Sequence, residues 1–217
     1  MRRLAFLLTA ITCLLATPLA VHADEPPTGA YIVRVLAPPA EFEPPCEGDT
    51  ADGGDLECIS FDVLSRVRTE VVQVIAGPDP GPQLQFEVAD HYGLPKLADY
   101  AHALVVVTMI PGDPWMERYM EVPLLRLADG GWATCGDLRD HPARPLQFAE
   151  DLGPRADFAR SRRAQLIPRG STRLRNGRIE CTQGVRVQDA YAALRATYMA
   201  RGGTALPERP AVWQDAP

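Results

Sequence analysis

Apolar and polar residues alternate along residues 59–71, and the alternation then shifts by one position. Most apolar residues, among them Val67 and Val71, take odd positions, whereas serine, arginine and acidic residues take most even ones. Because successive side chains of a strand point to opposite faces, this pattern predicts a strand with one buried and one exposed face. At Val72 and Val74 the apolar positions become even. The sequence therefore predicts either a bulge or a switch of the buried face, and a strand that bends in this way can serve two sides of a barrel.

Similar patterns predict further strands. Glycine and proline residues at 77–82 predict a turn into a strand that alternates through Leu84, Phe86 and Val88. Residues 103–110 are almost continuously apolar, which is typical of a central strand. Residues 121–127 and 132–135 are predicted to form two strands that pair across a turn containing Asp129-Gly-Gly. A further strand is predicted early in the chain, at residues 30–36. We therefore expect a mainly β protein with a mostly antiparallel sheet, whose core spans residues 24–135.

Residues 136–204 predict a C-terminal extension of the same domain. Asn176-Gly177 is typical of a tight hairpin turn, so we expect a hairpin at 171–183 with Arg175 opposite Arg178 and Thr172 opposite Cys181. A helix is predicted at 186–201, because apolar residues recur at helical spacing and Gly202-Gly203 follow. Its apolar positions predict packing against the sheet, although the two tyrosines also allow a ligand platform: Val187, Ala190, Tyr191, Leu194 and Tyr198.

The two ends of the chain predict processing and an irregular tail. Residues 1–23 resemble a signal peptide, with Arg2 and Arg3 before an apolar run and a small-residue site that ends at Ala23. The mature chain would begin at Asp24 and contains no later segment that could span a membrane. We therefore expect an exported protein, periplasmic or extracellular. Residues 205–217 are a proline-rich tail, in which Trp213 either packs on the domain or anchors a partner.

Four cysteines outside the leader predict two disulfides: Cys46, Cys58, Cys135 and Cys181. An even count in an exported chain favours disulfides over free thiols. Proximity in the sequence favours Cys46 with Cys58 and Cys135 with Cys181, although four cysteines allow three connectivities. No C-x-x-C pair or histidine spacing indicates a metal site or a cofactor. The acidic residues between Cys46 and Cys58 allow weak calcium binding, but a solvated disulfide loop is the favoured interpretation.

Charge is distributed unevenly in this acidic chain, whose formal net charge is −6. Residues 24–153 hold 8 basic and 23 acidic side chains, whereas residues 154–217 hold 12 and 5. The net acidity argues against nucleic-acid binding. A basic segment could bind an anionic ligand or an acidic envelope protein, or it could complement the acidic half of the chain itself. The candidate partner-binding residues are Arg160, Arg162, Arg163, Arg173, Arg175 and Arg178.

Strand order and patterning over residues 30–135 resemble bacterial relatives of the netrin and TIMP inhibitor modules. The resemblance is carried by AYIVRV, FDVLSRVRTEVVQVIAG, LQFEV, YAHALVVV and DGGWATCG, in this order. It implies a small antiparallel OB-like barrel, extended here by the C-terminal hairpin and the amphipathic helix. TIMP-type inhibitors use a cysteine at the mature N-terminus, and this chain would begin with Asp24, so protease inhibition is not implied. The resemblance implies a binding module without chemistry of its own.

The alternative is an enzyme, and its motifs can be searched for in the sequence. No serine lies in a G-x-S-x-G motif, and H-E-x-x-H is absent from the sequence. Two Asp-His pairs, Asp90-His91 and Asp140-His141, could suggest a general base, but neighbours in an extended segment point to opposite sides. Their histidines are therefore interpreted as loop-surface histidines. Distant carboxylates could still converge to form a hydrolase site. We therefore expect an exported, non-enzymatic binding module, with a hydrolase built from distant aspartates and glutamates as the alternative.

Overall fold

The structure is a computed structural model of the 217-residue chain. It is mainly β and contains one α-helix within the part that it describes. For residues 173–175, 178 and 179 the description covers the backbone. The described residues are 26–37, 39–42, 62–91, 95, 97, 100–150, 171–175, 178–203, 206–208 and 210–213.

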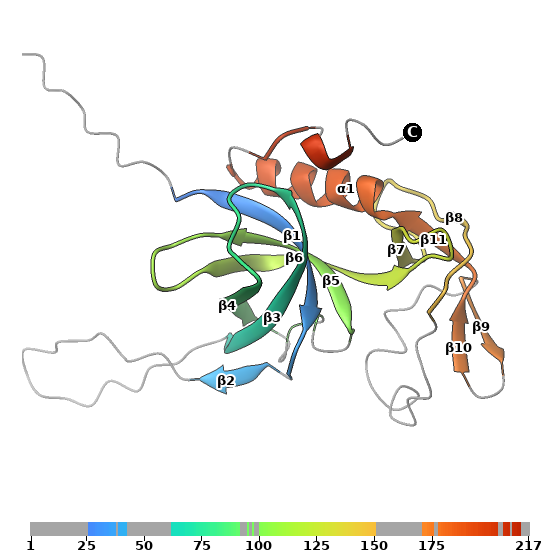
Figure 1. The fold of residues 1–217 in the computed structure, drawn as a ribbon, viewed down its shortest axis with the longest axis horizontal. Coiled ribbons are helices and arrows are strands. Elements are labelled where there is room, and N and C mark those ends of the chain that lie inside the picture. The colour runs from blue at the N-terminus through green and yellow to red at the C-terminus, as the bar shows by residue number, and fades with distance from the viewer. Residues whose placement is uncertain are drawn as a thin grey trace, which may run out of the picture.

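The elements follow one another as strands, then a helix, then a 3₁₀ turn, and Figure 1 shows their arrangement. In chain order they are β1 (Thr28–Val35), β2 (Ala40–Phe42), β3 (Val63–Ala76), β4 (Gln83–Asp90), β5 (His102–Thr108), β6 (Trp115–Arg126), β7 (Trp132–Cys135), β8 (Arg144–Pro145), β9 (Thr172–Arg175), β10 (Arg178–Cys181), β11 (Gln183–Arg186), α1 (Val187–Ala200) and η3 (Ala211–Trp213).

Five of the strands form a partly closed ring. Strand β1 pairs with β3 and β5, β3 pairs with β4, and β5 pairs with β6, all in antiparallel orientation. Strand β4 returns to β6 in parallel orientation, but this contact extends over only Glu87 with Trp115 and Val88 with Met116. Because this contact is short, the ring is only partly closed. The other four pairings are antiparallel, so the expected mostly antiparallel sheet is confirmed.

Strand β3 explains the shift in the sequence pattern. Ser65, Val67 and Thr69 are buried while the arginines between them are exposed, as the alternation predicted. Against β1, Ile32 pairs with Gln73 and Val33 pairs with Val71. Val72 is therefore left over as a bulge and is 38% exposed, and a second register shift leaves out Ile75 between the partners of Tyr31 and Ala30. The bulge interpretation is correct.

The interior of the ring is filled with apolar side chains. They come from all five strands and include Leu84, Phe86 and Val88 of β4 and residues 103–107 of β5. Burial of this kind is the dominant favourable term in folding, at about 25 cal/mol per Å² of apolar surface. The largest fully buried members on the ring strands are Tyr31, Phe86, Ile32, Leu104, Met116, Met120 and Leu124.

The turn after β3 fits closely against the start of β1. Gly77 has φ of +88°, and a Cβ atom there would lie 2.5 Å from the Cα atom of Gly29. Only glycine allows both this backbone conformation and this approach. The phenol of Tyr31 donates a hydrogen bond of 2.9 Å to the carbonyl of Pro78 and so fixes the same turn from inside the ring.

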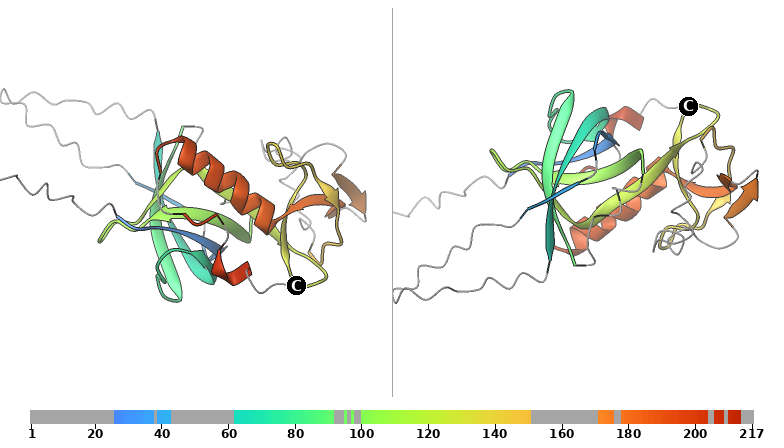
Figure 2. Two further views of the ribbon diagram at one scale, coloured as in Figure 1. Left: turned by 90° about the horizontal axis from the view of Figure 1, so that it is seen from above. Right: turned by 90° about the horizontal axis from the view of Figure 1, so that it is seen from below.

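A C-terminal layer continues the sheet beyond the ring. Strand β7 pairs with β6 and with β11, and β11 pairs with β8. Helix α1 packs over β6, β7, β11 and β5, as Figure 2 shows from two further sides. The residues predicted to form its apolar face are all buried, Tyr191 and Tyr198 included, so these tyrosines belong to the core. The helix ends one residue inside the predicted range at each side, and Gly202, with φ of +89°, follows it.

The described part of the tail packs against this layer. Residues 211–213 form the short 3₁₀ turn η3, and the ring of Trp213 contacts Tyr191 edge-on, with 5.3 Å between ring centroids. The phenol of Tyr191 also donates to the carbonyl of Pro207 at 2.6 Å. The interpretation of Trp213 as a packed residue is therefore confirmed.

Candidate binding surfaces

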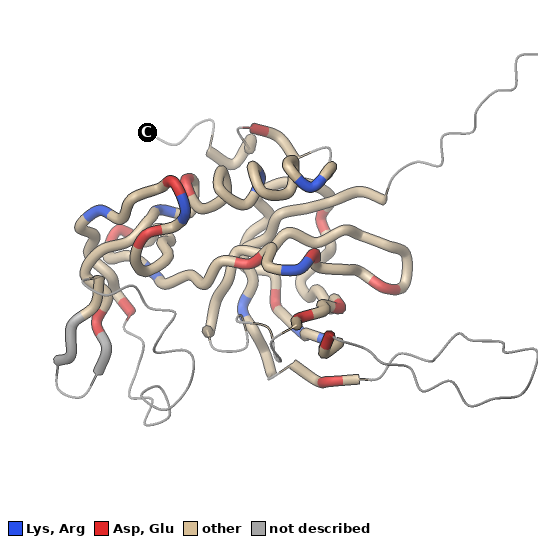
Figure 3. The backbone as a smooth tube through the Cα atoms, turned by 180° about the vertical axis from the view of Figure 1, so that it is seen from behind, with Lys and Arg blue, Asp and Glu red and all other residues tan. Residues whose placement is uncertain are grey.

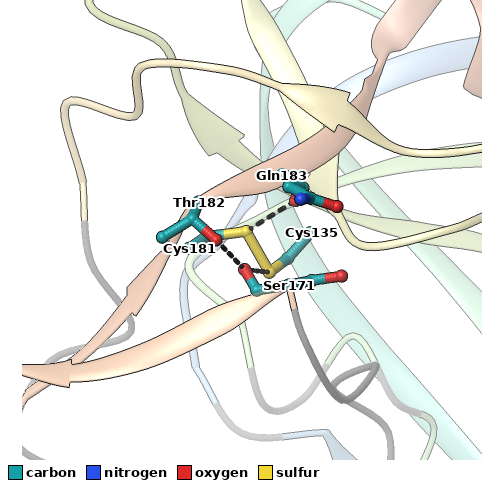
Figure 4. The surroundings of a disulfide bond; sticks show 5 residues. All are labelled: Cys135, Ser171, Cys181, Thr182 and Gln183. Atoms are coloured by element: carbon teal, nitrogen blue, oxygen red, sulfur yellow. Dashed lines mark hydrogen bonds between the residues drawn. A yellow bond between two sulfur atoms is a disulfide. The ribbon is translucent and has the colours of Figure 1, made fainter.

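The long-range disulfide lies at the junction of the C-terminal layer and the predicted hairpin. Cys135, at the end of β7, and Cys181, at the end of β10, are joined with 5.9 Å between their Cα atoms. The carbonyl of Ser171 accepts hydrogen bonds from the backbone N–H and the hydroxyl of Thr182, at 2.7 and 3.0 Å, and Figure 4 shows the bond from the hydroxyl. The pairing is the one that proximity in the sequence favoured. It joins the β10 side of the hairpin base to β7, and the hydrogen bonds from Thr182 to Ser171 hold the β9 side beside it.

The hairpin forms an arm, defined here as residues 171–181. Strands β9 and β10 make a two-stranded sheet of their own, and Figures 1 and 2 show it at the end of the molecule away from the ring. The register is the predicted one, with Arg175 opposite Arg178 and Arg173 opposite Glu180. Two like charges at directly opposite positions destabilise a hairpin, so the arm has no stability reason to carry both arginines next to the turn.

Other predicted site residues lie outside the described part of the chain. These are Cys46, Cys58, Arg160, Arg162 and Arg163. The leader at 1–23 and the acidic stretch between Cys46 and Cys58 also lie outside it. Among the described residues, no group of three or more histidine, cysteine, aspartate or glutamate side chains could hold a metal ion. In the same part of the chain, no helix is long and apolar enough to cross a membrane.

The outer face of the ring carries arginines that are paired with carboxylates. Arg34 on β1 bonds Glu70 on β3, and Arg66 on β3 bonds Glu87 on β4. Acidic and basic positions interleave over the described backbone, as Figure 3 shows. Pairs between neighbouring strands cancel charge locally, so this face offers little net attraction to an anionic partner. Arg68 is the exception, because it is exposed and its side chain bonds to no described residue.

A histidine and a tryptophan cover the junction between the ring and the C-terminal layer. The rings of His102 and Trp132 lie 4.8 Å apart, and the guanidinium of Arg126 stacks over Trp132 at 4.1 Å. Burial lowers the pKa of His102, and the nearby Glu150 opposes that shift. The imidazole is therefore held in its neutral form and packs as a flat side chain beside Trp132.

A surface cavity of about 260 Å³ lies between helix α1 and the segment that follows β7. Its floor is formed by Ala193 and Thr197, which are buried in the helix. On the opposite wall, Leu138 and His141 exchange backbone hydrogen bonds of 3.0 and 2.9 Å around a two-residue turn. The lining residues are Arg139, Asp140, His141, Ala193, Ala196, Thr197, Ala200 and Arg201.

The first residue of that turn is strained. Arg139 has φ of +50°, a region that glycine tolerates and that costs other residues about 1–2 kcal/mol. Its guanidinium donates to the hydroxyl of Thr197, which donates in turn to the carbonyl of Ala193 at 2.9 Å. Sequence reasoning placed Asp140 and His141 on the surface but missed the cavity, because its two walls lie far apart in the chain.

Comparison with known proteins gave no match, either to a protein family, to a curated protein or to a solved structure. The function must therefore be inferred from the geometry described above.

Proposed function

We propose that this protein is an exported, non-enzymatic binding module that captures an acidic partner through the arm at residues 171–181. The observation that carries this proposal is the arrangement of the arm: a separate hairpin, fastened at its base by Cys135–Cys181, with Arg175 directly opposite Arg178. Arginine suits this role because its planar guanidinium bonds carboxylates and phosphates in a bidentate manner. The partner is an envelope protein with an acidic surface or another anionic ligand.

The ring supports the proposal as a scaffold. Its order, β1-β3-β4-β6-β5, with β4 and β6 as the parallel pair, is similar to the five-stranded, partly open barrel of OB folds. We propose that the ring is such an OB-like barrel, in keeping with the resemblance to netrin and TIMP-type modules. Its interior is lined by apolar side chains, whereas the exposed arginines lie on the surface, which favours recognition of an anionic partner on the surface.

Export is supported by the disulfide. Disulfides persist in oxidising compartments and are rare in the bacterial cytosol. The pair Cys135–Cys181 therefore agrees with a leader at residues 1–23 and a mature chain in the periplasm or outside the cell. The hydrolase alternative gains no comparable support, because the cavity beside α1 contains two arginines and a single carboxylate, Asp140.

The test compares two variants of equal charge. In one, Arg175→Ser and Arg178→Ser remove the pair beside the hairpin turn. In the control, Arg68→Ser and Arg144→Ser remove two exposed arginines outside the arm. Binding of each purified protein to immobilised poly-glutamate is measured by surface plasmon resonance, and the melting temperature is measured in parallel.

The arm variant is expected to bind poly-glutamate about tenfold more weakly than the wild type, because each lost charge-assisted bond is worth about 1.5–3 kcal/mol before screening. The control should stay close to the wild type, and both melting temperatures should remain nearly unchanged. If both variants bound poly-glutamate equally weakly, binding would depend on net charge alone, and the proposed role of the arm would be refuted.

A further inference from the structure

The cavity between α1 and the turn at 138–141 has two arginines without an ion pair in one lining, whereas single arginines without one, such as Arg68 and Arg144, occur elsewhere on the described surface. Elsewhere, four described arginines form ion pairs with carboxylates: Arg34, Arg66, Arg118 and Arg186. Arg139 and Arg201, which both line the cavity, form no ion pair with any described residue. One hollow thus has two arginines in its lining, and the described part of the chain supplies neither with a partner anion.

Both guanidinium groups are held in place through neutral acceptors. Arg139 donates to the hydroxyl of Thr197, and Arg201 donates to the carbonyl of Arg118 at 2.6 Å. A guanidinium carries five N–H donors, so each group keeps donors that these bonds do not use. Fixed donors of this kind suit an incoming anion, because little side-chain freedom remains to be lost on binding.

The turn that carries Arg139 is shaped independently of the arginine. The side chain of Asp137 accepts a bond of 2.6 Å from the N–H of Ala143 and so closes the loop around the turn. Within the turn, Arg139 occupies a positive-φ position at which glycine is the favoured residue. An arginine stands there despite the backbone strain, and although the residue is exposed, its guanidinium bonds the hydroxyl of Thr197 on the cavity floor.

Two groups oppose a bound anion, and neither cancels the arginines. Asp140 lines the cavity, but its carboxylate bonds to neither Arg139 nor Arg201. The C-terminal carbonyls of α1 are also close, but those of Thr197, Tyr198 and Met199 already accept bonds from the backbone N–H groups of residues 201–203. The imidazole of His141 adds a further donor to the lining.

We propose that this cavity is a binding site for a small oxyanion, a carboxylate or phosphate group held between Arg139 and Arg201. Pockets for drug-sized ligands measure about 300–1,000 Å³, so a cavity of about 260 Å³ suits a single compact group. The site is separate from the arm, and it stands or falls independently of the function proposed for the arm.

The experiment uses inorganic phosphate and acetate as probes on the full chain. Binding is followed by the amide signals of Thr197 and Arg139 in ¹⁵N-labelled protein, in chloride buffer of matched ionic strength. The variants are Arg139→Gly, which removes the guanidinium and relieves the positive-φ strain, and Arg201→Gln, which leaves the turn intact. Arg68→Gln is the control, because it removes an exposed arginine outside the cavity.

Saturable shifts at Thr197 and Arg139 are expected with at least one probe, and each cavity variant should weaken binding about tenfold or more. The control should bind within about twofold of the wild type. Arg139→Gly should melt at the same temperature as the wild type or higher, so weaker binding cannot be attributed to unfolding. The site is refuted if neither probe gives a saturable shift, or if Arg68→Gln weakens binding as much as the cavity variants do.

Discussion

In the five-stranded ring, arginines pair with carboxylates on neighbouring strands, as Arg34 does with Glu70 and Arg66 with Glu87. In the C-terminal layer and the arm, the arrangement is different. Arg175 lies opposite Arg178 in the hairpin register, and two further arginines line a cavity. Exposed ion pairs contribute only about 0–1 kcal/mol, so the pairs on the ring matter less for stability than for cancelling charge.

If the arm and the cavity bind anions as proposed, the ring is the scaffold and recognition lies in the layer beyond it. The ring buries a continuous apolar core and neutralises much of its outer face. The layer beyond it presents cationic groups on elements held by the disulfide and by α1. One pair, Arg186 with Asp129, departs from this division and joins β11 to the turn between β6 and β7.

Removing the disulfide is expected to have the largest effect on the stability of the C-terminal layer and the arm. Cys135 and Cys181 are separated by 46 residues, and the entropy of closing a loop of this length corresponds to about 4 kcal/mol. We expect the double variant Cys135→Ser/Cys181→Ser to lose about this much unfolding free energy in urea. The arm should also show faster amide exchange than the ring, because the bond fastens its base.

The wild type under reducing conditions is the control for this prediction, and it should lose at least as much, since reduction would also open the predicted Cys46–Cys58 bond. A double variant within about 0.5 kcal/mol of the wild type would mean that the disulfide does not stabilise the C-terminal layer.

The stability of both regions at alkaline pH can be compared as well, and the expected effects are smaller than that of removing the disulfide. Burial raises the pKa of Tyr31, in the ring, and of Tyr191, in the helix, from 10.0 to about 12. The folded state therefore holds these protons more tightly than the unfolded state. This contribution to stability is complete below pH 10.0 and is lost as the pH rises to about 12. Urea unfolding at a series of pH values should show the loss.

Tyr31→Phe and Tyr191→Phe separate the contributions. Each variant should lose about 1 kcal/mol at neutral pH, because its hydrogen bond to the carbonyl of Pro78 or Pro207 is gone. Each should also show a shallower decline above pH 10.0 than the wild type. If both variants decline as steeply as the wild type, other groups cause the alkaline loss.

Local patterns in the sequence predicted much of this architecture. The bulge at Val72, the register of the arm and the extent of α1 each follow from periodicity or turn chemistry within a short segment. The closing contact between β4 and β6 did not follow, because it joins strands in parallel orientation without a local turn signal. The cavity could not be predicted from local patterns either, since Arg139 and Arg201 line it only once the helix has packed on the sheet.

Amide hydrogen exchange with and without poly-glutamate is the most direct test of the claim that recognition lies outside the ring. The account predicts slower exchange in the arm at residues 171–181 and in β11, with exchange in β3 and β4 unchanged. Protection confined to β3 and β4 would place the binding surface on the ring and contradict the account.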